Sequence, residues 1–160
     1  KQIVKWGLEL CSVILYLHNM KPEPIIFRNL RPDNIILSDR GTLKLIDFGI
    51  SKFFHKEQQT LEVAKIINIH FSPFEQYSGQ TDERTDIYSL GAVMYFMSTK
   101  TKPADAIDIN MEAAVLTPCR LFNPNLSVEF ETVILKAMRM FKEHRHQTVE
   151  ELRGELERLL

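Results

Sequence analysis

Apolar residues recur at a roughly helical spacing near the start of the chain, over residues 3–20. The positions concerned are Ile3, Leu8, Cys11, Leu15 and Leu17. This pattern predicts an amphipathic helix with one buried face. Pro22 and Pro24 follow it, and because proline cannot continue an α-helix, they mark its end.

Two short apolar runs come next, Ile35–Leu37 and Leu43–Ile46, with Asp39-Arg40-Gly41 between them. A tight-turn sequence flanked by apolar, partly β-branched residues predicts a small β-hairpin. Residues 50–72 have mixed polarity and no clear period, so we expect a long irregular loop there.

Helical signals return in the second half of the chain, where good N-cap residues precede three helical stretches. These stretches open at Thr81 or Asp82, at Ser127 and at Thr148, and reach Met97, Met140 and Leu160, respectively. The last one begins with T-V-E-E, a capping-box pattern. The complete pattern predicts a mainly α-helical domain with one hairpin and no βαβ repeat.

Length and charge limit the classes of partner. A chain of 160 residues with 44% hydrophobic residues can build one core and one domain. A net charge of -1 gives no bulk electrostatic attraction to nucleic acid or to an anionic membrane. Its longest apolar stretches, such as Val13–Leu17 and Gly91–Met97, are far shorter than the ~20 residues that span a bilayer. We therefore expect neither a nucleic-acid nor a membrane partner.

Cys11 and Cys119 lie far apart and match no zinc-binding or redox spacing. Reduced thiols in a cytoplasmic protein are the default interpretation of such cysteines. The chain starts at Lys1, in the middle of a helical pattern, which indicates a fragment of a longer protein.

The candidate chemistry lies around the predicted hairpin. Residues 27–34, F-R-N-L-R-P-D-N, precede its first strand, and Asp47-Phe48-Gly49 follows its second. The tripeptide alone carries little information, but it gains weight beside an R-x-L-x-P-x-N segment and a strand–turn–strand of suitable length. The combination resembles the catalytic loop H-R-D-L-x-x-x-N and the D-F-G triplet of eukaryotic-type Ser/Thr protein kinases.

Three further landmarks extend this resemblance over nearly the whole chain. Residues 72–77, S-P-F-E-Q-Y, resemble the end of the kinase activation segment, in the A-P-P-E-Q-Y form of bacterial Ser/Thr kinases. Asp86–Gly91 is similar to the start of the buried helix that supports the large lobe. Arg145 matches the arginine that pairs with the activation-segment glutamate, here Glu75.

The resemblance implies a fold and a domain organisation. The expected fold is mainly α, the C-terminal lobe of a protein kinase over residues 1–160, with one small hairpin that carries the catalytic and D-F-G loops. The smaller N-terminal lobe is absent from this chain. Arg28, Phe27, Phe48, Gly49, Glu75, Asp86 and Arg145 are expected to be structural.

Phosphoryl transfer needs divalent metal ions to neutralise phosphate charge, and such ions prefer oxygen ligands. The resemblance implies that Asn34 and Asp47 are Mg²⁺ ligands and that Ile36 and Leu37 form the floor of an ATP site. Taken alone, Asn34 would more simply cap a turn and Asp47 would be solvated. The surrounding motifs favour metal binding.

Asn29 is the main departure from the kinase pattern, because it stands where an aspartate accepts the proton of the substrate hydroxyl. An amide cannot usefully take a proton, and loss of a positioned base lowers a rate by ~10²–10⁴-fold. Arg31 replaces the lysine that touches the transferred phosphate, with a changed geometry. Phe27 replaces histidine and is expected to pack against Phe48.

The activation segment departs from the pattern as well. Ile67-Asn68 stands where such kinases have Gly-Thr, whose threonine reaches the catalytic aspartate. Thr60 is a possible phosphorylation site, although a solvated loop threonine is the simpler interpretation. His144 and His146 flank Arg145 and are expected to be solvated in a surface turn.

No G-x-G-x-x-G loop and no V-A-I-K lysine occurs in the sequence. This chain alone therefore offers half of an ATP site, so Mg²⁺ and ATP are expected only together with a small lobe, and the isolated chain is expected to be inactive. An apolar floor without a roof predicts a covering partner: the missing N-lobe, another protein or a second copy.

Three functions remain open on the sequence. The first is a pseudokinase lobe that serves as an interaction or allosteric module. The second is a truncated or deliberately inactivated Ser/Thr protein kinase that would transfer the ATP γ-phosphate to protein hydroxyls. The third is an unrelated helical binding domain.

Overall fold

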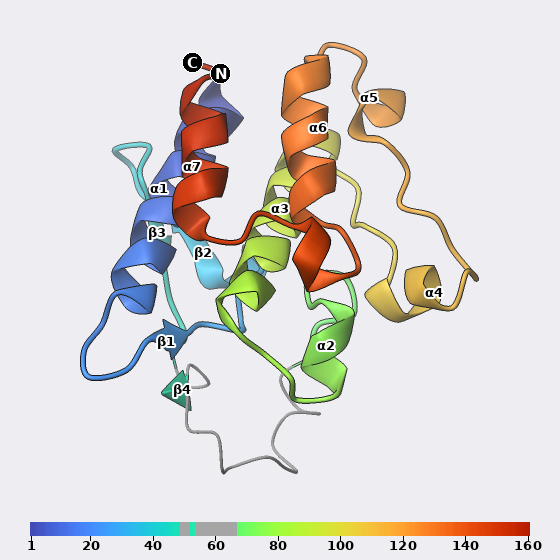
Figure 1. Ribbon diagram of the computed structural model, residues 1–160. Coiled ribbons are helices and arrows are strands. Elements are labelled where there is room, and N and C mark those ends of the chain that lie inside the picture. The colour runs from blue at the N-terminus through green and yellow to red at the C-terminus, as the bar shows by residue number, and fades with distance from the viewer. Residues whose placement is uncertain (49–51, 54–66) are drawn as a thin grey trace.

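The computed structural model describes residues 1–48, 52–53 and 67–160 (Figure 1). Its helices are α1 (Gln2–His18), α2 (Phe74–Tyr77), α3 (Glu83–Thr99), α4 (Ala106–Asn110), α5 (Cys119–Phe122), α6 (Val128–Ala137) and α7 (Val149–Glu157). Its strands are β1 (Ile25–Ile26), β2 (Ile35–Leu37), β3 (Leu43–Leu45) and β4 (Lys52–Phe53). Short 3₁₀ turns η1 and η3 cover Pro32–Asn34 and Lys142–His144. The expected mainly helical fold is confirmed.

The predicted N-caps are confirmed at all three helices. The Asp82 side chain accepts a hydrogen bond from the Arg84 N–H at 2.9 Å and caps α3, while Ser127 and Thr148 cap α6 and α7 in the same way. Helix α6 is shorter than predicted and ends at Ala137 rather than at Met140. Beyond it the chain turns, and its carbonyl groups become acceptors for another part of the fold.

The predicted hairpin is confirmed, since β2 and β3 pair antiparallel with Ile36 opposite Lys44. The Ser38 N–H donates to the Thr42 carbonyl at 2.9 Å and closes the turn. Gly41 adopts φ 77°, a left-handed conformation that favours glycine. A second pair, β1 with β4, was not predicted. Its strand β4 lies inside the expected irregular loop of residues 50–72 and corrects that prediction.

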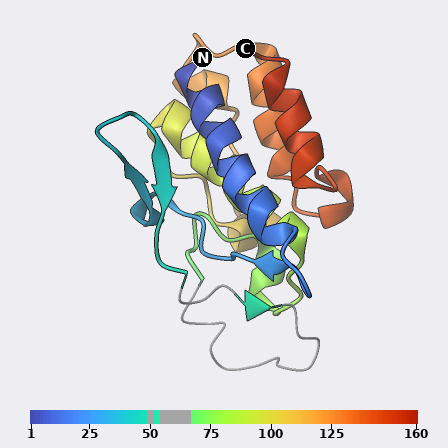
Figure 2. The same cartoon turned by 90° about the vertical axis from the view of Figure 1, so that its left-hand side faces the viewer.

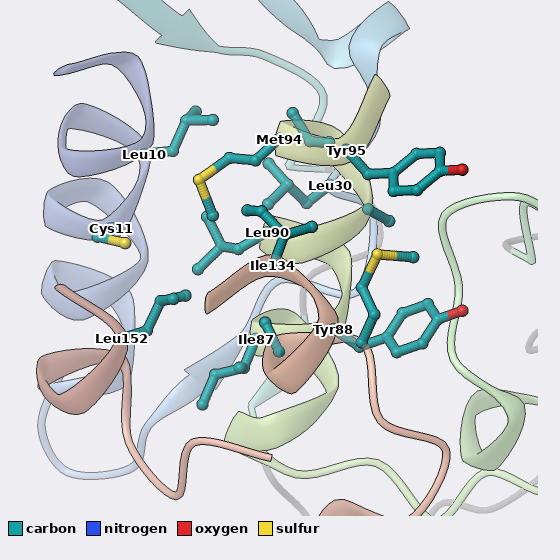
Figure 3. Close-up of a cluster of buried hydrophobic side chains, with 14 of the residues drawn as sticks. Leu10, Cys11, Leu30, Ile87, Tyr88, Leu90, Met94, Tyr95, Ile134 and Leu152 are labelled. Carbon is teal, nitrogen blue, oxygen red and sulfur yellow. The ribbon is translucent and has the colours of Figure 1, made fainter. Parts of the chain in front are cut away.

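Helix α3 is the centre of the core, with α1, α5, α6 and α7 packed around it. Figure 3 shows its side chains Ile87, Leu90 and Met94 on the same side of Leu10 of α1 and Leu152 of α7, which extend toward them. Such a helix is buried on nearly every face, which explains its weak amphipathic pattern. No helix within the described part of the chain is long and apolar enough to cross a membrane.

Glycine at position 91 allows α3 and α6 to approach closely. A Cβ atom at Gly91 would lie 2.8 Å from Met138 Cγ and 2.9 Å from Ala137 Cβ, closer than packed carbon atoms tolerate. Any larger residue at position 91 would therefore push the two helices apart.

Two polar contacts fix the hairpin to α1. The Trp6 indole N–H donates to the Gly41 carbonyl at 3.1 Å, at the tip of the turn. The Glu9 carboxylate accepts from the Leu43 N–H at 2.8 Å, at the start of β3. In Figure 2 the hairpin accordingly lies beside α1, on the side away from α7.

Arg145 ties the segment that contains α2 to the helical core. Its guanidinium donates to both oxygens of Glu75, at 2.7 and 3.0 Å. Its remaining N–H groups donate to the carbonyl oxygens of Arg84, Arg139 and Met140. All five N–H groups of a guanidinium are thus used, and both charged side chains are buried. The predicted Glu75–Arg145 pair is confirmed. The Arg145 guanidinium also binds the carbonyl oxygens of Arg139 and Met140, just beyond α6, which explains the early end of that helix.

Replacing Arg145 with alanine should lower the free energy of unfolding by ~3–5 kcal/mol, because the Glu75 carboxylate would stay buried without its partner. Arg153→Ala is the matched control, since Arg153 pairs with Glu157 on an exposed face of α7 and such pairs contribute ~0.5 kcal/mol or less. Denaturant unfolding of both variants measures the difference. Equal losses in the two variants would contradict the buried pair.

His146 is buried, so the expectation of a solvated side chain was wrong. Its Nε2 lies 2.9 Å from Glu155 of α7, whose other oxygen accepts from Lys136 of α6 at 2.7 Å. Its Nδ1 is buried without a hydrogen-bond partner among the described residues. Burial lowers the pKa of His146, against the opposing influence of Glu155 and Glu151. The ring therefore packs in its neutral form, with Nε2–H donating to Glu155.

Because the folded pKa of His146 is lowered, the unfolded chain binds a proton near pH ~6.5 before the folded chain does. The free energy of unfolding should therefore fall as the pH drops below ~6.5, by ~1.4 kcal/mol per pH unit at most. Urea unfolding between neutral and mildly acidic pH measures the slope. His146→Gln should flatten it, and the exposed His144→Gln should leave it unchanged. A wild-type slope in both variants would contradict the assignment.

Candidate functional site

The loop between β1 and β2 is anchored by hydrogen bonds to the side chain of Asp86, near the start of α3. One carboxylate oxygen accepts from the Phe27 N–H and from His18 Nε2, both at 2.8 Å. The other accepts from the Arg28 N–H at 2.8 Å. Asp86 is fully buried, so these donors replace the water that a carboxylate would otherwise need. Its expected structural role is thereby explained.

Arg28 is held on both sides of its backbone. It adopts φ 62°, a left-handed conformation that is costly for a residue with a side chain. The Asp86 carboxylate accepts from the Arg28 N–H, and the Gln76 side-chain amide donates to the Arg28 carbonyl oxygen at 3.0 Å. Burial lowers the pKa of the Arg28 guanidinium, partly offset by the charge of Asp86. Helix α2 therefore helps to fix the loop.

Phe27 packs as expected against Phe48. The two rings make an edge-to-face contact with centroids 5.2 Å apart, and Phe27 is fully buried. Aromatic pairs of this geometry stabilise a fold beyond the area that they bury. The contact joins the loop before β2 to the segment after β3.

Asn29, Asn34 and Asp47 come together where these two segments meet. The Asn29 amide nitrogen lies 3.3 Å from both the backbone oxygen and the Oδ2 atom of Asp47. The Asn34 amide nitrogen donates to the Asn29 carbonyl oxygen at 2.8 Å. The Ile46 N–H donates to the Asn34 carbonyl at 2.9 Å, so the hairpin ladder itself aligns the two loops.

The oxygen atoms of this cluster fit a hard divalent cation. Asn34 commits its amide nitrogen to Asn29, which leaves its side-chain oxygen as the atom able to bind a metal. Asp47 adds a carboxylate. Among the described residues, no three His, Cys, Asp or Glu side chains form a metal-binding group. A metal held here would take its other ligands from outside this set, such as phosphate oxygens or water.

The expected floor residues lie open at the surface. Ile36 is 48% exposed and Leu37 51% exposed. Arg31 is partly exposed, and its Nε atom lies 3.9 Å from the Asp33 carboxylate, a loose ion pair. Its charge is therefore available near the loop.

Asn68 has a local role in the chain. Its side-chain oxygen accepts from the His70 N–H at 3.2 Å, and its backbone oxygen accepts from the Phe71 and Ser72 N–H groups. This is an Asx-type turn, which asparagine forms readily. The predictions for Gly49 and Thr60 fall outside the described residues.

Sequence reasoning missed two residues that shape the site, His18 and Gln76. His18 reaches Asp86 from the end of α1, and Gln76 reaches Arg28 from α2. Gln76 lies inside the S-P-F-E-Q-Y motif, so its position was a usable signal. His18 has no such signal, because its partner is 68 residues away.

Comparison with known proteins gives a consistent result. The profile of the family described as "Protein kinase domain" matches residues 1–154. A probable serine/threonine-protein kinase of Clostridium perfringens is 34% identical over 143 residues, which cover 84% of this chain and 21% of that protein. Serine/threonine-protein kinase PknB of Mycobacterium leprae is 27% identical over 167 residues, which cover 99% of this chain and 26% of that protein.

A solved structure points to the same fold. The protein described as "PpkA-294 apo form" matches with a TM-score of 0.78 and 27% sequence identity, over 97% of this chain and 53% of that one. The chain thus spans 21% and 26% of the length of the two relatives above, and about half of this structural neighbour.

Proposed function

The chain belongs to the protein kinase family, and on that premise we propose that it is the C-terminal lobe of a pseudokinase that acts as an interaction or allosteric module. In this proposal the loops that hold metal are retained, and the catalytic base is missing. The expected activity on protein hydroxyl groups is correspondingly weak or absent.

The observation that carries this proposal is the side chain at the base position. Asn29 is almost fully buried, and its amide nitrogen is directed at Asp47. A general base must accept a proton from the attacking hydroxyl, and a neutral amide has no useful basicity for that step. This side chain supports the proposal of a kinase-like loop that lacks the group able to accept the proton.

Metal and nucleotide binding are proposed only for a protein that also has a small lobe. Asn34 and Asp47 would then hold Mg²⁺, and Ile36 and Leu37 would contact the adenine from below. Bound Mg²⁺ would neutralise the charge of the phosphates. Arg31 would contribute positive charge near the transferred group, without the geometry of a lysine.

A second candidate is a Ser/Thr protein kinase of low activity, or one inactivated by a single Asp→Asn change. The intact supports favour it: Asp86 holds the loop, and Arg145 holds Glu75. Against it stand the further changes at Arg31 and Asn68, which a single inactivating substitution would not explain.

The two candidates predict different chemistry for the full-length protein. We expect measurable Mg²⁺-dependent ATP binding by calorimetry, together with radiolabel transfer far below the ~1–100 s⁻¹ of ordinary kinases. Asn29→Asp alone should recover little activity, because its neighbours are also changed. Asn29→Asp combined with Arg31→Lys and Asn68→Thr should recover more.

Transfer by the wild-type protein at ordinary kinase rates would overturn the pseudokinase proposal. Absence of Mg²⁺-dependent ATP binding would instead leave Asn34 and Asp47 as structural residues.

The partner is proposed to cover the open apolar surface formed by Ile36, Leu37 and Phe48. A small lobe is the occupant that the family implies, and another protein or a second copy are the alternatives. A cytoplasmic location also stays a proposal, supported by the two buried, free cysteines Cys11 and Cys119.

If this surface is uncovered, the 160-residue chain should self-associate through it. Leu37→Glu should then weaken the association, because a charge would enter an apolar contact. Val115→Glu is the control, since Val115 is an apolar residue, more exposed than Leu37, on the segment between α4 and α5. Sedimentation velocity over a range of concentrations measures both. A monomer at every concentration would exclude self-association and leave the small lobe or another protein as the occupant.

A further inference from the structure

We propose that Asn29 is a positioning residue whose amide group takes the place of a metal ion at Asp47. In the absence of metal, this amide would hold the Asp47 side chain and backbone in the arrangement that a bound cation would otherwise impose. The inference deepens the proposed function, because it rests on the assignment of Asp47 as a metal ligand.

The contact is made by one nitrogen atom to two oxygen atoms of the same residue. Asn29 Nδ2 lies 3.3 Å from the Asp47 carbonyl oxygen and 3.3 Å from its Oδ2. An amide nitrogen carries two hydrogens, one for each of these acceptors. A cation bound by Asp47 would likewise attract its carboxylate, whereas an aspartate at position 29 could donate to neither oxygen.

Asp47 needs such support because of its backbone conformation. It adopts φ 61°, in the left-handed region that residues with a side chain avoid. Strained conformations of this kind persist only where the surroundings impose them. The Asn29 amide reaches the carbonyl oxygen of this residue directly, so it acts on the backbone as well as on the carboxylate.

Asn29 cannot easily withdraw from Asp47. It is 4% exposed, and its own carbonyl oxygen accepts from the Asn34 amide. The preceding residue, Arg28, is fixed by Asp86 and Gln76. A carboxylate at position 29 would therefore face the Asp47 carboxylate at close range, and the repulsion between them would be relieved by a bound cation or by a shared proton.

The consequence is a site whose shape does not depend on metal. In the wild-type protein the amide supplies the two donors, so Mg²⁺ should add little to stability. In Asn29→Asp the site would carry two negative charges and would lose the amide that donates to Asp47. The same fold would then depend on Mg²⁺ for the stability of this region.

Thermal unfolding without nucleotide tests whether stability depends on Mg²⁺. Melting temperatures are measured in EDTA and in Mg²⁺, with ionic strength matched by NaCl. The wild-type melting temperature should be nearly the same in both. Asn29→Asp should melt ~5 °C or more below wild type in EDTA and recover most of that loss in Mg²⁺. The charge-swapped variant Asn29→Asp/Asp47→Asn is the matched control, because it restores one amide facing one carboxylate. It should melt near wild type in EDTA and respond little to Mg²⁺.

If Asn29→Asp fails to fold in EDTA, the same melting experiment is done with Asn29→Ala, since this change removes the donor without adding charge. It should melt below wild type, and Mg²⁺ should raise its melting temperature more than that of the wild type. An Asn29→Asp variant as stable as wild type in EDTA would overturn the proposal. Rescue by the charge swap without rescue by Mg²⁺ would also overturn it, because Asp47 would then not be a metal site.

These outcomes are separate from those of the proposed function. The melting experiment uses neither ATP nor substrate, so it can succeed when phosphate transfer and nucleotide binding are both absent. Conversely, weak transfer with normal ATP binding would support the pseudokinase proposal even if Asn29→Asp were fully stable in EDTA.

Discussion

The arrangement of the site depends on one buried carboxylate, that of Asp86. A charged group with no exposed surface must find hydrogen-bond donors within the fold, and Asp86 finds them in the backbone of Phe27 and Arg28 and in the ring of His18. Because two of these donors are consecutive backbone N–H groups, the chain can pass Asp86 in very few conformations. The left-handed conformation of Arg28 follows from this constraint, and it directs Asn29 toward Asp47.

A second buried acid, Glu75, fixes the segment that contains α2 to the core, as Asp86 fixes the loop between β1 and β2. Its partner Arg145 also takes three carbonyl groups, so one side chain joins α2, the start of α3 and the turn beyond α6. Both acids are buried and use their oxygen atoms on hydrogen-bond donors of the fold. The residues that support the site, Asp86, Glu75 and Arg145, are therefore distinct from Asn29, Asn34 and Asp47, whose side chains meet between the two loops.

The parts of the fold that could be predicted from the sequence are those determined by neighbouring residues or by a known motif. The hairpin followed from a turn sequence between apolar runs, and the helix starts followed from Asp82, Ser127 and Thr148. The strands β1 and β4 have two residues each, too few for a period. His146 was misplaced because polar neighbours suggested a surface turn, whereas its burial depends on Glu155 and Lys136 of two other helices. The contacts of His18 and Gln76 are equally non-local.

Replacement of an acid by its amide has a different meaning at a support and at a reacting position. At Asp86, an amide would turn a donor toward backbone N–H groups that need an acceptor, so the loop would lose its anchor. At position 29 the neighbours of the side chain are themselves acceptors, the two oxygens of Asp47. There an amide supplies what the surroundings lack, and a carboxylate would add to the negative charge. An asparagine at position 29 therefore satisfies two acceptors of the loop, so under the proposed function a lobe without a catalytic base would keep the shape of this loop.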